Sequence, residues 1–494
     1  MADDSKKRIL FWPDVYKEQG HWLPTLSWAE RLKDTYDIAY MGIADCQELI
    51  SRYNAKNQTN FKYWPIFSST YELGYTDKTR TTPSSRWKED HLWSIAYSRY
   101  GKYKERMTYG ASQKQAAECG IIRALLVGDY EDDSFEDGFD TSTLPEKSGD
   151  RKNPSLLVSG YFTALETLIF YYLRKADDKY FKKLDLNFAI STTYLRHPSE
   201  DPAMRAMQSL MALSPAARNK LINLVYPVDQ PKPSGNDLIQ EPDISLEEFV
   251  TPLSDFDELI PCPRDFEYSH YQFCSKVHFV EPCITKELKT IDDASADIDW
   301  KTILSKPKLV YVTAGSQVLD YEDKALSLFK SIIDAMQSAD MNGYHLIVCV
   351  GSTLIEKETW KNYDNVTVCG WAPQREILNA ISQKDHKGSC AIIHGGLATI
   401  KECVYYNVPF LVLPLGKDQI DNALRLENYG INNRFFVEFV KPKCLQYFIN
   451  KIISDKQSLK MLDKLSKVFH AAEDVVETAG EKVLKDLLSA TKGA

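Results

Sequence analysis

The stretch with the most chemistry in a short span is AIIHGGLATIKE, residues 391–402. Its pattern predicts a buried strand that ends at His394, two glycines, and a helix that begins near Ala398. A helix N-terminus offers free N–H groups and partial positive charge, which suit a diphosphate. His394 can donate a hydrogen bond to a phosphate oxygen, and Glu402 can accept hydrogen bonds from ribose hydroxyls. An ordinary strand–turn–helix junction remains open, because a short glycine motif is weak evidence by itself.

Two neighbouring segments could recognise the rest of such a ligand. GWAPQREIL carries Trp371, which can stack on a base, and Gln374, which can hydrogen-bond a ribose. PLGKDQIDNA carries Asp418 and Gln419, which could bond the hydroxyls of a hexose. The alternatives are a core tryptophan in the first segment, and a solvated turn with a helix cap in the second.

In order and spacing, these segments resemble the donor-binding box of the family 1 glycosyltransferases, the UDP-glycosyltransferases. The resemblance covers GWAPQ, then HGG with Glu402 eight residues after the histidine, then VPFLVLPLGKDQ with Asn422. In addition, YVTAGSQ is similar to the loop that opens the family's C-terminal domain. The donor-binding residues implied by the resemblance are Ser316, Trp371, Ala372, Gln374, His394, Gly396, Ala398, Thr399, Glu402, Asp418 and Gln419.

The resemblance also implies a role for most of these positions. Trp371 would stack on uracil, Gln374 and Glu402 would contact the ribose, and Ser316 would touch the β-phosphate. The diphosphate would lie on the segment from His394 to Thr399, and Asp418 with Gln419 would hold the sugar. Residues 397–399 depart from the family, since they are Leu-Ala-Thr where plant members have Trp-Asn-Ser. Plant members with a glutamine at the end of the box tend to use glucose, so UDP-glucose is the expected donor.

A second candidate for chemistry lies near the start of the chain, in RILFWPDVYKEQGHWLPTLSWAERL. His21 is predicted on a loop after the first strand, and Pro24 is predicted to start a helix. A loop histidine titrates near neutrality and can take a proton from a hydroxyl, although it can also be structural. The segment resembles the family's first strand, catalytic loop and first helix, which implies that His21 is the base that deprotonates the acceptor.

The carboxylate partner of this histidine is missing from its expected place. In many family members the partner stands at the end of a strand about a hundred residues later. NPSLLVSGYFTALE is similar to that strand and its helix, but Gly160 occupies the Asp position. We therefore expect another acid to replace it, such as one from the acidic run 129–140, or His21 to act alone on a comparatively acidic acceptor such as a phenol.

The elements around these segments alternate between short apolar strands and amphipathic helices, which favours parallel sheets with crossover helices. At 494 residues, two to three domains are expected. The expected strands are 9–12, 38–41, 155–158, 187–190 and 276–280 in the first half, and 309–312, 346–350, 366–369, 391–393 and 410–413 in the second. The aromatic-rich interval 61–103 either lines the acceptor site or is ordinary packing.

With the resemblance, this alternation implies the GT-B architecture, an α/β fold of two facing Rossmann-like domains. Residues 1–285 would bind the acceptor, 286–300 would be the linker, and 301–465 would bind the nucleotide sugar. Residues 466–494 would form a C-terminal helix that crosses back onto the first domain.

Composition excludes several other classes of protein. The net charge of −9 argues against a general binder of nucleic acids. Ten scattered cysteines without a CxxC pair indicate a reducing compartment. The start lacks the apolar stretch of a signal peptide, and the most apolar window, 156–173, contains Glu166 and is not expected to span a membrane. We therefore expect a cytoplasmic protein. The dispersed histidines predict no metal site, and no cofactor is expected besides the UDP-sugar co-substrate.

The sequence thus predicts an inverting glycosyltransferase that moves a hexose, most simply glucose, from a UDP-sugar to a hydroxyl of a small aromatic or natural-product acceptor. Three alternatives remain open. They are a natural-product glycosyltransferase that uses a deoxysugar on thymidine diphosphate, a nucleotide-sugar epimerase, and a degenerate non-catalytic partner protein. An epimerase gives His21 no role, and a degenerate homologue would not need both His21 and the full donor box.

Overall fold

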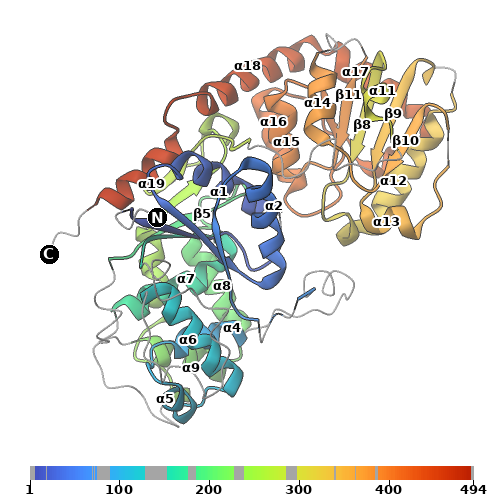
Figure 1. Ribbon diagram of the computed structural model, residues 1–494. Helices are drawn as coiled ribbons and strands as arrows, with labels where there is room; N and C mark the ends of the chain where they lie inside the picture. The colour runs from blue at the N-terminus through green and yellow to red at the C-terminus, as the bar shows by residue number, and fades with distance from the viewer. Residues whose placement is uncertain are drawn as a thin grey trace. The chain divides into compact units, whose positions relative to one another are not determined.

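The chain forms two compact units, of which the computed structural model describes most residues (Figure 1). Unit 1 consists of Met1–Pro261, Gln272–Phe279 and Ala479–Ala494, and unit 2 of Cys262–Tyr271 and Val280–Thr478. The described residues are 6–17, 19–68, 71, 73–74, 90–127, 153–175, 185–226, 238–284, 298–338, 341–361, 363–383 and 388–490. The acidic run 129–140 and most of the expected linker, 286–297, lie outside these residues.

Unit 1 is built on a seven-stranded parallel sheet in the order β3-β2-β1-β4-β5-β6-β7. Its strands are β1 (Arg8–Trp12), β2 (Asp37–Gly42), β3 (Lys62–Pro65), β4 (Pro154–Gly160), β5 (Asn187–Ser191), β6 (Asp257–Ile260) and β7 (Val277–Phe279). β1 is buried along its whole length, as expected of a strand covered on both faces. The strand order reverses between β1 and β4, and ligands of such sheets bind at this switch point.

The helices of unit 1 connect the strands of this sheet and pack around it. They are α1 (Gln19–Leu32), α2 (Gln47–Asn57), α4 (Asp90–Tyr97), α5 (Tyr103–Thr108), α6 (Gln113–Val127), α7 (Ala164–Lys175), α8 (Pro202–Ala212), α9 (Pro215–Val225), α10 (Leu246–Val250) and α19 (Ala479–Ser489). The last of these, α19, returns from the end of the chain to unit 1 (Figure 1). Lys7 Nζ donates to the Leu488 carbonyl and Asn187 Nδ2 to that of Leu487, each at 2.6 Å.

Unit 2 is built on a five-stranded parallel sheet in the order β10-β9-β8-β11-β12. Its strands are β8 (Lys308–Thr313), β9 (Tyr344–Cys349), β10 (Val366–Cys369), β11 (Cys390–Ile393) and β12 (Phe410–Val412). Its helices are α11 (Trp300–Leu304), α12 (Glu322–Ala335), α13 (Ser352–Lys357), α14 (Gln374–Ser382), α15 (Leu397–Tyr405), α16 (Gln419–Tyr429), α17 (Leu445–Ser454) and α18 (Lys456–Glu473). The order again reverses at the first strand, β8.

Several elements differ from the sequence predictions. β3 and β6 were not predicted, because KYWP and DELI are too short and polar to show a strand pattern. The expected boundary at 465/466 falls inside α18, which belongs to unit 2. The segment 262–271 also belongs to unit 2, where the buried Glu267 carboxylate accepts from Arg425 Nε on α16 at 2.7 Å.

Several aromatic side chains of the interval 61–103 are packed in the core, as far as the interval is described. Phe67, Tyr71, Tyr97 and Tyr100 have at most 1% of their surface exposed. Trp87, which belongs to the same interval, lies outside the described residues. Phe67 lies against both Trp12 of β1 and His91 of α4.

Candidate functional site

In unit 2, the end of β11 places His394 against two glycines. The N-cap of α15 is Gly396, and an added Cβ there would lie 2.5 Å from Nε2 of His394. Gly315, in the loop after β8, makes room on another side, since its Cβ would lie 2.5 Å from Cε1 of the same ring. Gly395 has a φ of +98°, which favours glycine. The glycines therefore seat the imidazole at the switch point of the sheet.

Burial determines the charge of His394. The pKa of this imidazole is lowered from the ordinary 6.5 to about 4, first by desolvation and then by the nearby charge of Lys417. A hydrogen bond with the Thr313 backbone opposes the fall only in part. His394 is therefore neutral at neutral pH and offers a ligand a dipolar N–H rather than a full charge.

Gln374 and Glu402, both predicted to contact the ribose, are joined directly. Gln374 Nε2 donates to Oε2 of Glu402, and Arg375 Nε donates to Oε1 of the same carboxylate at 2.7 Å. Tyr311 on β8 donates its hydroxyl proton to Gln374 Oε1 at 2.9 Å. The sequence analysis missed Arg375 and Tyr311. Arg375 could have been noticed, since an arginine beside Gln374 can reach the helix that carries Glu402.

Gln419, predicted to hold the sugar, also holds its own loop. Its Oε1 accepts from the backbone N–H groups of Leu415 at 2.7 Å and Gly416 at 3.1 Å. Its Nε2 donates to the Tyr321 hydroxyl at 3.2 Å. The carbonyl end of Gln419 is thus engaged by the protein.

Asp418 stands at the N-cap of α16, but its side chain makes no capping bond there. Asn422 Nδ2 donates to Asp418 Oδ2 at 2.8 Å and to the Gly395 carbonyl at 3.1 Å. Asn422 therefore ties the expected sugar-binding loop to the turn that carries His394.

The remaining predicted donor residues lie at the same edge of the sheet. Trp371 and the buried Ala372 follow β10, and Trp371 is half-buried rather than a core residue. Ser316 is exposed after β8. Ala398 is exposed and Thr399 buried in the first turn of α15, whose N–H groups have no acceptor within the helix.

In unit 1, His21 lies on the first turn of α1, and not on a loop as predicted. The helix begins at Gln19 and contains Pro24, which was expected to start it. Pro24 has no N–H to donate to the Gly20 carbonyl, so the first turn of the helix lacks that hydrogen bond.

His21 has a carboxylate partner after all. Its Nδ1 contacts Oδ2 of Asp14, whose side chain is 4% exposed. Phe162 stacks on the imidazole, with ring centroids 5.2 Å apart. The expectation of an acid from 129–140, or of no partner, was therefore incomplete: Asp14 stands only seven residues before His21. The tripeptide WPD at the end of β1 was the available signal.

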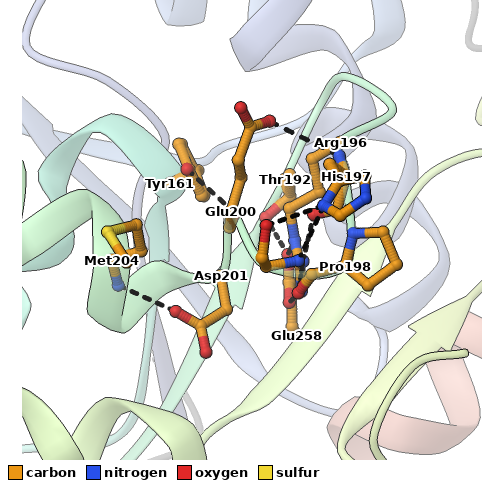
Figure 2. Close-up of polar contacts among 10 residues, drawn as sticks. Tyr161, Thr192, Arg196, His197, Pro198, Glu200, Asp201, Met204 and Glu258 are labelled. Carbon is orange, nitrogen blue, oxygen red and sulfur yellow. Dashed lines mark hydrogen bonds and ion pairs between the residues drawn. The ribbon is translucent and has the colours of Figure 1, made fainter.

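The loop between β5 and α8 is held by several polar contacts (Figure 2). Arg196 Nε donates to Glu258 Oε1 at 2.8 Å, and Arg196 Nη1 donates to the carbonyls of His197 and Pro198 at 3.0 Å. The Tyr161 hydroxyl donates to the Glu200 carbonyl at 3.0 Å. These contacts fix the path of the chain into α8.

Phe162 borders this braced loop. Its ring stacks on Tyr194, with centroids 5.7 Å apart, and the Arg205 guanidinium lies 5.0 Å from its centroid. Phe162 is nevertheless 39% exposed. An exposed aromatic ring against a histidine is a surface on which a flat apolar ligand can pack.

Among the described residues, no group of three or more histidine, cysteine, aspartate and glutamate side chains could hold a metal ion. None of the described helices is long and apolar enough to cross a bilayer.

Part of the chain is similar in sequence to known transferases. Residues 354–474 match the family model of the UDP-glucuronosyl and UDP-glucosyl transferases. The chain is 22% identical over 214 residues to the uncharacterized UDP-glucosyltransferase YdhE of Bacillus subtilis, covering 43% of this chain and 49% of that protein. It is 21% identical over 198 residues to the oleandomycin glycosyltransferase of Streptomyces antibioticus, covering 40% and 42%. The chain thus spans less than half the length of these relatives.

The likeness in structure extends over the whole chain. The crystal structure of the kitacinnamycin glycosyltransferase superposes with a TM-score of 0.58 and 16% identity, covering 98% of this chain and 99% of that one. At this identity the likeness establishes the fold, which is GT-B with two Rossmann-like units. Residues 354–474 of unit 2, which carry most of the predicted donor-binding residues, are thus similar to the UDP-glucuronosyl and UDP-glucosyl transferases, the family that the sequence resembles.

Proposed function

We propose that the protein is an inverting glycosyltransferase that moves glucose from UDP-glucose to a hydroxyl of a small aromatic acceptor. One observation carries the proposal. Side chains suited to bind a nucleobase, a diphosphate and a sugar all follow strands of one parallel sheet, at its carboxyl edge. Trp371 follows β10, His394 follows β11, and Asp418 follows β12. Ligands of such sheets bind at that edge.

The proposed reaction requires a base for the acceptor and an electrophilic environment for the leaving group. The hydroxyl proton passes to Nε2 of His21, because Nδ1 faces Asp14. The oxygen then bonds to the anomeric carbon as the bond to the diphosphate breaks, and the diphosphate leaves with the electron pair. The N–H groups at the start of α15 and the neutral His394 stabilise this charge.

The acceptor class and the sugar rest on separate observations. Phe162, partly exposed and stacked on His21, supports a flat aromatic acceptor placed beside the base. Asp418 accepts a hydrogen bond from Asn422, and a carboxylate can accept several, so it retains capacity for sugar hydroxyls. The choice of glucose follows from Gln419 and the family resemblance.

The test is a competition of donors. UDP-glucose, UDP-galactose and a thymidine-diphosphate deoxysugar are offered together with a panel of phenols, and products are identified by mass and anomeric configuration. We expect a β-glucoside, with UDP-glucose preferred about ten- to a hundredfold in kcat/KM, because an epimer leaves a buried polar group unpaired.

The other outcomes distinguish the alternatives. A product lighter than the hexoside by one oxygen would mean that the donor is a deoxysugar. Conversion of UDP-glucose to its epimer without acceptor would mean an epimerase. Binding of UDP without transfer from any donor would mean a non-catalytic protein.

A further inference from the structure

The ends of β1 and β4 lie side by side, and the backbone after β1 passes directly over Gly160. The two strands are parallel neighbours, with Trp12 opposite Ser159. A Cβ at Gly160 would lie 1.8 Å from the carbonyl oxygen of Pro13 and 2.7 Å from its carbonyl carbon. Backbone atoms cannot move aside as a flexible side chain can. No side chain therefore fits at position 160 while Pro13 holds this place.

Backbone conformation does not explain the glycine. Gly160 has φ −79° and ψ 159°, which every amino acid adopts readily. Its lack of a side chain is required by space alone, and the group that takes this space is the peptide that leads into Asp14.

We infer that Asp14 is the positioning residue for His21. The lack of a side chain at Gly160 leaves room for the Pro13 peptide, which places Asp14 beside the imidazole. The inference rests on the proposed function, in which His21 is the base. A buried carboxylate on Nδ1 keeps the proton on that nitrogen, so that Nε2 presents its lone pair to the acceptor. After proton transfer, the same carboxylate stabilises the imidazolium. Asp14 acts through His21 and touches no reacting atom.

The contacts of Asp14 agree with this role. Its side chain is 4% exposed, whereas that of His21 is 21% exposed, so the carboxylate lies behind the ring and the ring reaches solvent. A buried carboxylate needs a compensating donor, and the imidazole N–H supplies one. Phe162 covers a ring face and restricts rotation. The imidazole is thus held from its edge and from a face.

The coupling of positions 14 and 160 has a consequence for substitutions. A carboxylate can come from the end of β1 or from the end of β4, but the same space cannot serve both. Replacing Gly160 by Asp in an Asp14→Asn protein should therefore not restore activity, because the new side chain meets Pro13.

The first experiment compares Asp14→Asn with Asp37→Asn. Asp37 binds Arg8 at the opposite end of β1, so its variant is a matched loss of one carboxylate far from His21. We expect Asp14→Asn to lower kcat by about 10²- to 10⁴-fold, with the KM for UDP-glucose unchanged. The loss should be smaller for an acidic nitrophenol, which is already ionised, than for an aliphatic alcohol. Asp37→Asn should leave kcat and this dependence near wild type.

The second experiment needs no activity. Nitrogen-15 NMR of labelled histidine reports which ring nitrogen carries the proton, and His21→Gln identifies the signal. We expect an Nδ1–H form in the wild type and its loss in Asp14→Asn but not in Asp37→Asn. If the wild type transfers sugar from no donor, the proposed function fails. The NMR measurement still decides whether Asp14 fixes the tautomer of His21.

Defined results would overturn the inference. One is a wild-type kcat of Asp14→Asn with both the nitrophenol and the aliphatic alcohol. Another is an unchanged tautomer of His21 in that variant, and a third is an equal loss of kcat with all acceptors. Gly160→Ala should show the same dependence on acceptor acidity as Asp14→Asn, because it displaces the Pro13 peptide. Full activity of a folded Gly160→Ala protein would refute the coupling, and if that variant does not fold, the Asp14 variants remain decisive.

Discussion

The neutral, buried state of His394 predicts a specific loss of stability in acid. The imidazole has a pKa of about 4 in the folded chain, against the ordinary 6.5 expected after unfolding. Between these values the unfolded chain binds a proton that the folded chain does not, so the free energy of unfolding falls as the pH is lowered. The stabilisation is complete above about pH 6.5 and is lost by about pH 4. At about 1.4 kcal/mol per pKa unit, the loss approaches 3 kcal/mol.

The perturbation that isolates this effect is His394→Gln, because glutamine is uncharged at every pH. Urea unfolding of unit 2, followed by fluorescence from pH 4 to 7.5, gives the free energy of unfolding for both proteins. Their difference should grow by about 3 kcal/mol in favour of the wild type between pH 4 and 6.5. His470→Gln, which removes a half-exposed imidazole from the same unit, should not reproduce this growth.

A ligand should change the result in a defined direction. If UDP places its diphosphate beside His394, the negative charge raises the pKa of the imidazole, and saturating UDP should reduce the loss in acid. The state of a buried, neutral histidine would be refuted if the difference in free energy of unfolding between wild type and His394→Gln stayed constant over the whole pH range. If saturating UDP leaves the loss of stability in acid unchanged, the diphosphate binds elsewhere.

Three further predictions concern the proposed reaction. His21→Ala should lower kcat by about 10²- to 10⁴-fold, with UDP affinity unchanged in calorimetry; near-normal transfer to an acceptor that is not ionised would exclude the base role. Glu402→Ala should weaken UDP binding by about ten- to a hundredfold through lost ribose hydrogen bonds. Glu427→Ala, the control, loses an ion pair with Arg434 in the same unit and should leave UDP affinity unchanged. Equal UDP affinities of the two variants would show that Glu402 does not bind the ribose. Phe162→Ala should raise the KM for aromatic acceptors about two- to tenfold, as expected for one ring–ring contact, and an equal effect on aliphatic acceptors would argue against stacking.

The sequence alone determined the α/β class and the donor-side segments. The reason is local: an apolar run, a glycine turn and an amphipathic helix follow each other within about a dozen residues, as at β11, His394 and α15. Short elements with little apolar content carried no such signal. β6 begins with Asp257 and Glu258, and the buried Glu258 is paired with Arg196, a partner that lies far away in the sequence.

The tertiary structure alone decided which side chains meet. The family resemblance placed Gly160 where a carboxylate was expected. The tertiary structure shows instead that Pro13 fills that space and that Asp14 reaches His21. The order of strands, their register and the direction of each side chain determine such contacts, and no local pattern encodes them. For this reason the sequence identified His21 as a candidate base, whereas the fold supplied its partner.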